Sequence, residues 1–263
     1  MTKREFEHLY GQYREGNTTP DVLRALEPYR VQNAVILAAG RSTRFEPLSL
    51  SHPKGLLVVK GEVMVERQIR QLQEAGIPDI TLVCGHMREQ FFYLREKYGV
   101  DILINEDYDR YNNSSTLLTA KDRIGSTYIC SSDNYFTENV FTPYAYRPYY
   151  SGVCVSEDSY EYCMETTRSG RINRVTWDII NGKWSMRGHV YFSKKFSKAF
   201  IPFLEKSFDT DPEVRTHFWE YCLVQDINRF PIWLKKHEPG VIQEFDALEE
   251  LIAFEPDTPY RNC

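Results

Sequence analysis

The sequence predicts an α/β protein with a mostly parallel sheet and helices on both of its faces. Between residues 33 and 130, short apolar runs that end in turn residues alternate with segments whose apolar residues recur at helical spacing. The first of these runs, residues 34–39, is uninterrupted, as is typical of a strand buried on both faces. After about residue 148, aromatic-rich runs separated by glycine turns indicate a second, mixed or antiparallel part.

The elements of the first part follow from these patterns in order. Gly40, Gly85 and Asn105 end strands, whereas Gly76 and Gly99 end helices. Asn112 or Asn113 is suited to cap the helix that follows. The predicted strands are 33–39, 80–84, 100–104 and 127–130, with a short run at 56–59, and the predicted helices are 64–75, 88–98 and 113–123.

The second part is predicted to hold four strands, two helices and a short closing segment. The turns between strands are placed at Ser169-Gly170 and Asn181-Gly182. Asp246, followed three residues later by Glu249, has the form of a capping box that starts a last helix. The predicted strands are 150–155, 160–167, 172–177 and 184–192, the helices are 194–207 and 212–226, and the edge strands are 232–234 and 241–245.

The N-terminal segment is expected to be a separate helical arm. Phe6, Leu9 and Tyr13 recur at helical spacing, and Pro20 starts a second short helix. A packing arm is favoured over a homodimer contact or the remnant of a helix-turn-helix. The expected division is an arm at 1–30, a main domain at 31–254, and a tail or linker at 255–263.

Composition restricts the class of protein. The 263 residues are 42% hydrophobic, which suffices for one substantial core. A net charge of −5 argues against a duplex nucleic-acid partner. No apolar run approaches the roughly 20 residues that span a bilayer, and the N-terminus lacks an apolar signal core. The six cysteines form no CxxC pair, so free thiols and a cytoplasmic enzyme are expected.

The stretch 33–59 is a candidate phosphate-binding loop. Gly40 breaks the first apolar run, and a polar loop with Arg41 and Arg44 leads to Pro53-Lys54. Backbone N–H groups at such a turn can bind phosphate oxygens. The loop has neither a Walker motif nor GxGxxG. The residues alone leave an ordinary solvated loop as the alternative.

These residues also carry a resemblance to a known family. The run LAAGRSTRF, with Pro53-Lys54 further on, resembles the LAAGxGxR…PK signature of the nucleotidyltransferases. Further short motifs are similar in order and spacing to the bacterial choline-phosphate cytidylyltransferases, over about residues 33–254. The resemblance implies a Rossmann-like, nucleotide-diphospho-sugar transferase-like fold. The motifs are Glu66-Arg67-Gln68-Ile69, Val83-Cys84-Gly85, Tyr111-Asn112-Asn113 and Ser132-Asp133-Asn134.

The resemblance implies that CTP and phosphocholine react to give CDP-choline and pyrophosphate. The acceptor phosphate would attack the α-phosphorus in line, a transfer that depends on positioning and charge neutralisation. Lys54 and Arg44 would contact the phosphates, and Asp133 would complete the catalytic set. The implied nucleotide-binding residues are Leu37, Ala38, Ala39, Gly40, Arg41, Ser42, Thr43, Gln68, Gly85, His86 and Ser132.

Asp133 and Asp246 are the candidate Mg²⁺ ligands. Asp133 follows a predicted buried strand, at the edge where ligands of an open α/β sheet gather. Asp246 follows another predicted strand, at 241–245. Two carboxylates can share a Mg²⁺ that also binds triphosphate oxygens. A helix N-cap explains Asp246 equally well without a metal.

The aromatic-rich part is the candidate acceptor side. A quaternary ammonium has no N–H groups and is recognised by aromatic faces and nearby carboxylates. Core packing is the alternative for each aromatic residue, because the chain has 18 Tyr, 15 Phe and 4 Trp. The candidate acceptor-binding residues are Asn113, Glu161, Tyr162, Tyr191, Trp219 and Glu220.

Two departures from the family pattern leave other functions open. Ser42 stands where the family has a second loop glycine, and Ser131 stands where many relatives carry an acid. The acceptor alternatives are phosphoethanolamine, an aminophosphonate and a sugar 1-phosphate, and the alternative of another class is a non-catalytic nucleotide-sensing module. Because relatives of this type can be fused to a choline-kinase-like domain, a further domain after residue 263 is also an expectation.

Overall fold

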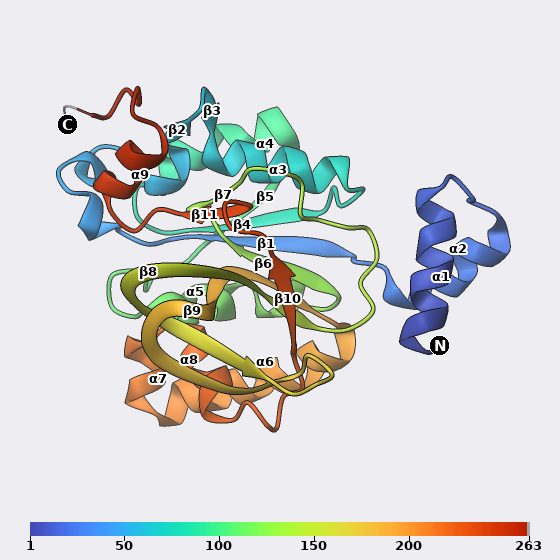
Figure 1. The fold of residues 1–263 in the computed structure, drawn as a ribbon. Helices are drawn as coiled ribbons and strands as arrows, with labels where there is room; N and C mark the ends of the chain where they lie inside the picture. Colours follow the sequence, from blue (N-terminus) through green and yellow to red (C-terminus); the bar gives the residue numbers. More distant parts are fainter. Residues whose placement is uncertain (262–263) are drawn as a thin grey trace.

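A seven-stranded sheet forms the centre of the molecule (Figure 1). The computed structural model describes residues 1–261, and for residues 156–159 the description is confined to the backbone. The strand order is β10-β8-β9-β6-β1-β4-β5. The pairs β6–β1, β1–β4, β4–β5 and β10–β8 are parallel, whereas β9 is antiparallel to both β6 and β8. The predicted mostly parallel sheet and the mixed second part are both present.

The strands end close to their predicted positions in the first half and extend further in the second. Two small two-stranded sheets, β2–β3 and β11–β7, accompany the main sheet. The strands are β1 (Asn33–Ala38), β2 (Val58–Val59), β3 (Glu62–Val63), β4 (Ile80–Cys84), β5 (Asp101–Ile104), β6 (Thr127–Ser131), β7 (Asn134–Phe136), β8 (Tyr149–Thr166), β9 (Ile172–Phe192), β10 (Trp233–His237) and β11 (Ile242–Glu244).

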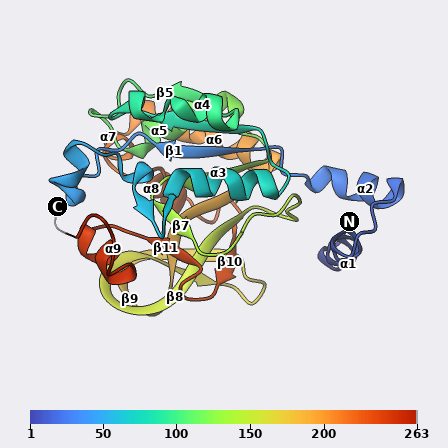
Figure 2. The same ribbon diagram turned by 90° about the horizontal axis from the view of Figure 1, so that it is seen from above.

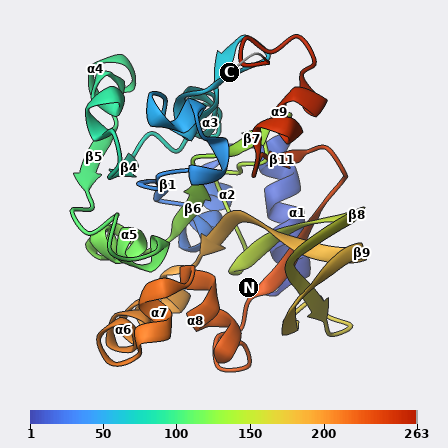
Figure 3. The ribbon, with the colours of Figure 1, turned by 90° about the vertical axis from the view of Figure 1, so that its left-hand side faces the viewer.

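Helices cover both faces of the sheet (Figures 1 and 3). Apolar residues of α3 and α4 pack on one face, and those of α5, α6, α7 and α8 pack on the other. The helices are α1 (Lys3–Arg14), α2 (Pro20–Leu26), α3 (Met64–Glu74), α4 (Tyr93–Tyr98), α5 (Asn113–Thr119), α6 (Lys194–Thr210), α7 (Pro212–Thr216), α8 (Trp219–Gln225) and α9 (Leu248–Phe254).

Two predictions for the second half are wrong. The four predicted strands are two long ones, β8 and β9, that form a single hairpin across the Ser169-Gly170 turn. Gly182 lies inside β9 with φ +67°, where the register shifts, because a bulge absorbs a glycine without ending the strand. The predicted helix 212–226 is broken into α7 and α8, since His217 and Phe218 have extended backbones.

Helices α1 and α2 pack together beside the main body (Figures 1 and 2). Their apolar faces form a cluster with Tyr144 of the main body. Phe6 of α1 and Leu26 of α2 are both buried in this cluster. The Thr2 side chain accepts a hydrogen bond from the N–H group of Glu5, which completes a capping box at the start of α1. The arm is thus attached to the main body through the loop that precedes β8.

Two further features concern membrane-spanning helices and cysteine pairing. Within residues 1–261, no helix is long and apolar enough to cross a membrane. Each of the five cysteines in the part of the chain that the structure describes is a free thiol, as expected, and Cys84, Cys130, Cys163 and Cys222 are buried.

Candidate active site

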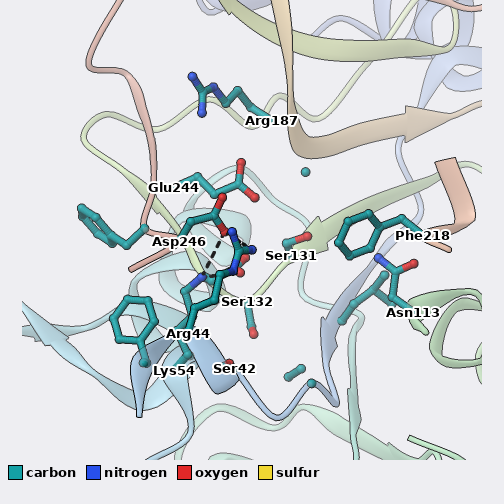
Figure 4. A pocket seen from close by; sticks show the side chains of 18 of the residues that line it. Ser42, Arg44, Lys54, Asn113, Ser131, Ser132, Arg187, Phe218, Glu244 and Asp246 are labelled. Atoms are coloured by element: carbon teal, nitrogen blue, oxygen red, sulfur yellow. Dashed lines mark hydrogen bonds and ion pairs between the residues drawn. The ribbon is translucent and has the colours of Figure 1, made fainter. Parts of the chain in front are cut away.

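A cavity of about 1460 Å³ opens where strands β1 and β6 end. Ligands of an open α/β sheet bind at such an edge, where the strand order reverses: β4 and β5 lie on one side of β1, and the later strand β6 lies on the other. One wall is the polar loop after β1, with Lys54 beyond it. The other wall comes from the β8–β9 hairpin and the start of α8. Arg44, Lys54 and Asp246 lie at one side, with Asn113 and Phe218 opposite them (Figure 4).

Lys54 is buried at the base of the first wall. Its ammonium lies 2.9 Å from Asp133 Oδ2 and 3.9 Å from Asp246 Oδ1, and the side chain is only 7% exposed. Burial alone favours the neutral amine, but the charge and hydrogen bond of Asp133 outweigh it, so the pKa of Lys54 lies above its usual value. Lys54 therefore presents a permanent positive charge to the cavity.

A short antiparallel pairing brings the two predicted metal ligands together. Strand β7 starts directly after Asp133, and β11 ends two residues before Asp246. Glu244 pairs with Asn134 in this register, so the two aspartates leave the same end of the small sheet. Residues that are distant in the sequence thus face one cavity.

The capping-box prediction for Asp246 is wrong. Helix α9 starts at Leu248, its N-cap is Ala247, and the backbone N–H of Asp246 donates to Glu250 Oε2 at 2.6 Å. The Asp246 side chain is therefore not used as a cap. It accepts instead a 2.7 Å hydrogen bond from Arg44 Nη2.

Ser42 has a left-handed backbone. Its φ and ψ are 51° and 45°, and it precedes the single helical turn that carries Arg44. This region costs an L-residue roughly 1–2 kcal/mol and is the region that glycine adopts freely. The loop therefore has the conformation for which a glycine is suited, with a serine side chain facing the cavity.

A third carboxyl group, that of Glu244, lies beside the two aspartates. Burial, and then the charges of Asp133 and Asp246, raise the pKa of Glu244 well above its usual value. Asp133 Oδ1 is buried and has no hydrogen-bond partner in the described structure. An unpaired oxygen among clustered carboxylates fits a hard divalent cation. No ready-made group of three His, Cys, Asp or Glu ligands occurs within residues 1–261, so substrate oxygens and water would have to complete the coordination.

Two glutamates give the opposite wall its acidity. Burial, and then the negative charge of Asp246, raise the pKa of Glu161 to about 7. Burial also raises the pKa of Glu220 to about 7, although Tyr150 donates a 2.8 Å hydrogen bond to Glu220 Oε1. Glu220 Oε2 forms no close hydrogen bond in the described structure, although the nearby Asn113 side chain partly offsets the effect of burial on the pKa. Both glutamates favour a cation beside them, because a positive charge would stabilise their ionised forms.

Exposed aromatic rings complete this wall. Trp177 is 58% exposed and Phe218 is 47% exposed, and both line the cavity. The Tyr162 ring packs edge-on against Trp177, with ring centroids 5.3 Å apart. Large apolar rings are usually buried, so free ring faces around a cavity indicate a ligand surface. Carboxylates with aromatic faces are the combination that binds a small organic cation.

Most of the predicted site residues line this one cavity. On the loop side, residues 37–44 are consecutive. On the acceptor side, the residues come from α5, β8 and α8. The predicted residues that line it are Leu37, Ala38, Ala39, Gly40, Arg41, Ser42, Thr43, Arg44, Lys54, Asn113, Ser132, Asp133, Glu161, Tyr162, Glu220 and Asp246.

Two of the predicted acceptor residues lie in the core instead. Trp219 is 2% exposed and packs on Phe192 and Phe200, because the start of α8 turns it inward while its neighbour Phe218 faces the cavity. Tyr191 is also buried, and its hydroxyl group bonds to Ser126. It lies on β9, where side chains alternate between the two faces of the sheet.

Three predicted nucleotide-binding residues do not line the cavity. Gln68 is fully buried beneath the loop that carries Asp133. The backbone N–H of His86 donates to the carbonyl oxygen of Ala39. Gly85 packs so closely on Tyr108 that an added Cβ would lie 2.5 Å from Tyr108 Cβ. Gly85 and His86 therefore support the loop after β1, and Tyr108 lines the cavity beside them.

The sequence prediction missed several cavity residues. Glu244 lies on the predicted strand 241–245, two positions before the predicted ligand Asp246. Side chains two positions apart on a strand point to the same face, and this alternation could have identified Glu244. Trp177 had no signal beyond its residue type. The missed lining residues include Tyr108, Tyr150, Trp177, Arg187 and Glu244.

Comparisons with known proteins agree with this geometry. Residues 34–139 match the MobA-like NTP transferase domain. The chain is 32% identical to the 2-aminoethylphosphonate cytidylyltransferase of Lancefieldella rimae, covering 85% of this chain and 92% of that protein. It is 29% identical to the choline-phosphate cytidylyltransferase of Streptococcus pneumoniae, covering 82% and 94%.

A solved structure gives the same result for the fold. The CTP:phosphocholine cytidylyltransferase of Streptococcus pneumoniae superposes with a TM-score of 0.82 at 29% identity, covering 86% of this chain and 98% of that one. These comparisons give no support to a fused choline-kinase-like domain. They do identify the chain as an enzyme that transfers nucleotidyl groups. The chain belongs to the nucleotidyltransferase family, in the group that contains the bacterial cytidylyltransferases.

Proposed function

We propose that this cytidylyltransferase joins CTP to phosphocholine, giving CDP-choline and pyrophosphate. The observation that carries the proposal is the two-sided cavity, in which Lys54, Arg44 and two aspartates face exposed aromatic rings and two glutamates. The first side suits a triphosphate. The second suits a small organic cation that carries its own phosphate.

The reaction needs one bond to form and one to break. An oxygen of the acceptor phosphate attacks the α-phosphorus of CTP in line, and the bond from that phosphorus to the β-phosphate oxygen breaks as pyrophosphate leaves. Lys54 stabilises the negative charge on the reacting phosphates, and Arg44 holds the departing β- and γ-phosphates. The loop 39–44 places the triphosphate, and the aromatic wall orients the acceptor.

Mg²⁺ is the cofactor that we propose for this site. Asp133 and Asp246 would hold it, and the unpaired, buried Asp133 Oδ1 supports that assignment. When bound, the ion neutralises charge on the triphosphate and draws its oxygens into one geometry. Lys54 already contacts both carboxylates and Arg44 contacts that of Asp246, so the lysine and the arginine would have to exchange part of these contacts for phosphate.

A specific observation favours a second acceptor, 2-aminoethylphosphonate or phosphoethanolamine. Glu220 Oε2 is buried and the Asn113 side chain is the polar group described near it, so this oxygen has room for a stronger hydrogen-bond donor. A primary ammonium has N–H groups and a trimethylammonium has none. The relative from Lancefieldella rimae, by its name, uses an aminophosphonate.

A substrate panel tests both proposals. Purified protein with Mg²⁺ is given CTP, UTP or ATP together with phosphocholine, phosphoethanolamine, 2-aminoethylphosphonate or a sugar 1-phosphate, and pyrophosphate release is measured. The expected result is the highest kcat/KM for CTP with phosphocholine. A higher kcat/KM with phosphoethanolamine or 2-aminoethylphosphonate would identify that compound as the acceptor in place of phosphocholine. Binding of CTP without pyrophosphate release from any acceptor would support a nucleotide-sensing module instead.

A further inference from the structure

We propose that Gln68 is a positioning residue that holds the backbone on both sides of Asp133 and so aims its carboxylate at the reacting centre. The inference rests on the proposed function, because it gives Asp133 a role in turnover. Gln68 itself lies outside the cavity and touches no substrate in this scheme.

The side-chain amide of Gln68 spans the loop between β6 and β7. Its Nε2 atom donates to the carbonyl oxygen of Ser131 at 2.9 Å and to that of Asn134 at 2.7 Å. A primary amide has two N–H groups, and both are used. The two carbonyl oxygens belong to the residues two positions before and one position after Asp133. The loop is therefore fixed from one point on helix α3.

The amide has one orientation. Turning it by 180° would point Oε1 at the same two carbonyl oxygens, which cannot donate. In the observed orientation Gln68 Oε1 is buried and has no partner in the described structure. Burying an unpaired amide oxygen costs free energy of desolvation that an apolar side chain would not. The two hydrogen bonds of the amide fix the position of the loop, which an apolar side chain could not do.

Two further contacts hold the same loop. The N–H group of Ser132 donates to Leu37 O at 3.0 Å, and the Asn134 side chain donates to Arg187 O at 3.0 Å. With its neighbours held, Asp133 has only the two torsions of its own side chain. Its Oδ2 atom meets Lys54 Nζ at 2.9 Å, which fixes those as well. A misplacement of about 1 Å in such a group can cost about a hundredfold in rate.

Gln71 provides a matched control one turn further along α3. It is the same residue type, it is 2% exposed, and its Oε1 atom also lacks a partner in the described structure. Its Nε2 atom donates to Phe136 O at 3.2 Å, beyond the loop. That oxygen also accepts from Arg67 Nε at 2.6 Å, so it keeps a partner when Gln71 is replaced. Removing the Gln71 amide thus alters the same helix without releasing Asp133.

The experiment compares Gln68→Leu with Gln71→Leu by pyrophosphate release and thermal unfolding. Gln68→Leu is expected to lower kcat at least tenfold more than Gln71→Leu, with the KM for CTP changed less than threefold. If the leucine variant does not fold, Gln68→Met, which keeps the length of the side chain, carries the same comparison. Equal losses of kcat in the two positions would overturn the inference and indicate a general packing role.

A double-mutant cycle separates this inference from the proposed function. If Gln68 acts through Asp133, adding Gln68→Leu to Asp133→Ala should change the residual turnover less than threefold. The same fold-loss in both backgrounds would contradict the positioning role while leaving the proposed function intact. Wild-type turnover in Asp133→Ala alone would instead remove the proposed role of Asp133, and the inference with it.

Discussion

The ammonium group of Lys54 lies 2.9 Å from the carboxylate of Asp133, although the two residues are 79 positions apart in the sequence. Lys54 starts a single helical turn, whereas Asp133 follows β6 at the carboxyl edge of the sheet. The pair joins the phosphate side of the cavity to its candidate metal ligands. Asp133 stabilises the charged form of Lys54 in a poorly hydrated place, since its charge and hydrogen bond outweigh the effect of burial on the pKa of Lys54.

Replacing Lys54 with alanine should therefore lower kcat/KM by about 10²–10³-fold, since a charge placed to stabilise the transition state is lost. The variant also leaves Asp133 without its partner. Lys60→Ala is the control, because Lys60 is exposed and lies against the Phe254 ring rather than in the cavity. Steady-state pyrophosphate release measures both. A Lys54→Ala loss no larger than the control's would contradict the proposed role.

Glu220 should make acceptor affinity depend on pH. Its pKa of about 7 means that the acid is protonated at pH 6 and ionised at pH 8. The KM for a cationic acceptor should then fall several-fold between pH 6 and pH 8, because only the ionised form attracts the cation. Glu220→Gln should flatten this dependence while the KM for CTP stays within threefold of the wild type. An unchanged pH profile in Glu220→Gln would rule out the assignment.

Glu220 should also make the free energy of unfolding depend on pH. Because the folded-state pKa of Glu220 lies above its usual value of 4.5, the folded protein keeps a proton that the unfolded chain releases first. The free energy of unfolding should therefore fall as the pH rises from about 4.5 to about 7. Denaturant unfolding of wild type and Glu220→Gln at pH 5 and pH 8 measures the difference. A larger pH effect in the variant would contradict this sign.

Ser42→Gly should keep the enzyme active and relieve the backbone strain in the loop after β1. Ser42 holds a left-handed backbone, which glycine adopts without a steric penalty. We expect a KM for CTP equal to or below that of the wild type, whereas Ser42→Val should raise it, because a β-branched residue resists this conformation. Steady-state kinetics with varied CTP check both variants. Improved kinetics in Ser42→Val would show that the loop changes conformation when CTP binds.

Gly55→Ala should disturb the site by displacing Ser132. A Cβ atom at this position would lie 2.9 Å from both Cβ and Oγ of Ser132, which is too close for either residue to stay in place. Since Gly55 follows Lys54 and Ser132 precedes Asp133, the ion pair between them should loosen and kcat should fall about tenfold or more.

Gly11→Ala is the matched control for this substitution. Gly11 lies in α1, and an added Cβ meets no atom within 4 Å. Alanine there should stabilise the helix by about 0.5–1 kcal/mol and leave turnover unchanged. The two substitutions are compared by kcat and by thermal unfolding. A Gly55→Ala variant with wild-type kcat would show that the contact with Ser132 relaxes at no cost to the site.

The nucleotide side of the site was predictable because its signals are local. The buried run of β1, the break at Gly40, and the charges at Arg44 and Lys54 all lie within one stretch of sequence. Asp133 followed from the end of a strand. The prediction placed these residues in one site without knowing the pairing of β7 with β11, which brings Asp246 beside them.

The acceptor side was harder to predict because its residues depend on tertiary context. Phe218 and Trp219 are adjacent aromatics, and only the break between α7 and α8 decides which of them faces the cavity. Gln68 carried a family motif, yet its amide turns toward backbone carbonyl oxygens instead of the nucleotide. Residue type and spacing do not show which of several polar partners a buried side chain meets.

The division of the cavity into two walls has a consequence for how such enzymes diversify. The loop and strand ends of the proposed phosphate side lie before residue 134, apart from the β11 segment, whereas the rings and glutamates of the other wall belong mainly to the β8–β9 hairpin and α8. Exposed rings such as Trp177 and Phe218 contribute little to the core. Exchanges at these positions can therefore create a new acceptor preference in few steps, while the inherited nucleotide chemistry is retained.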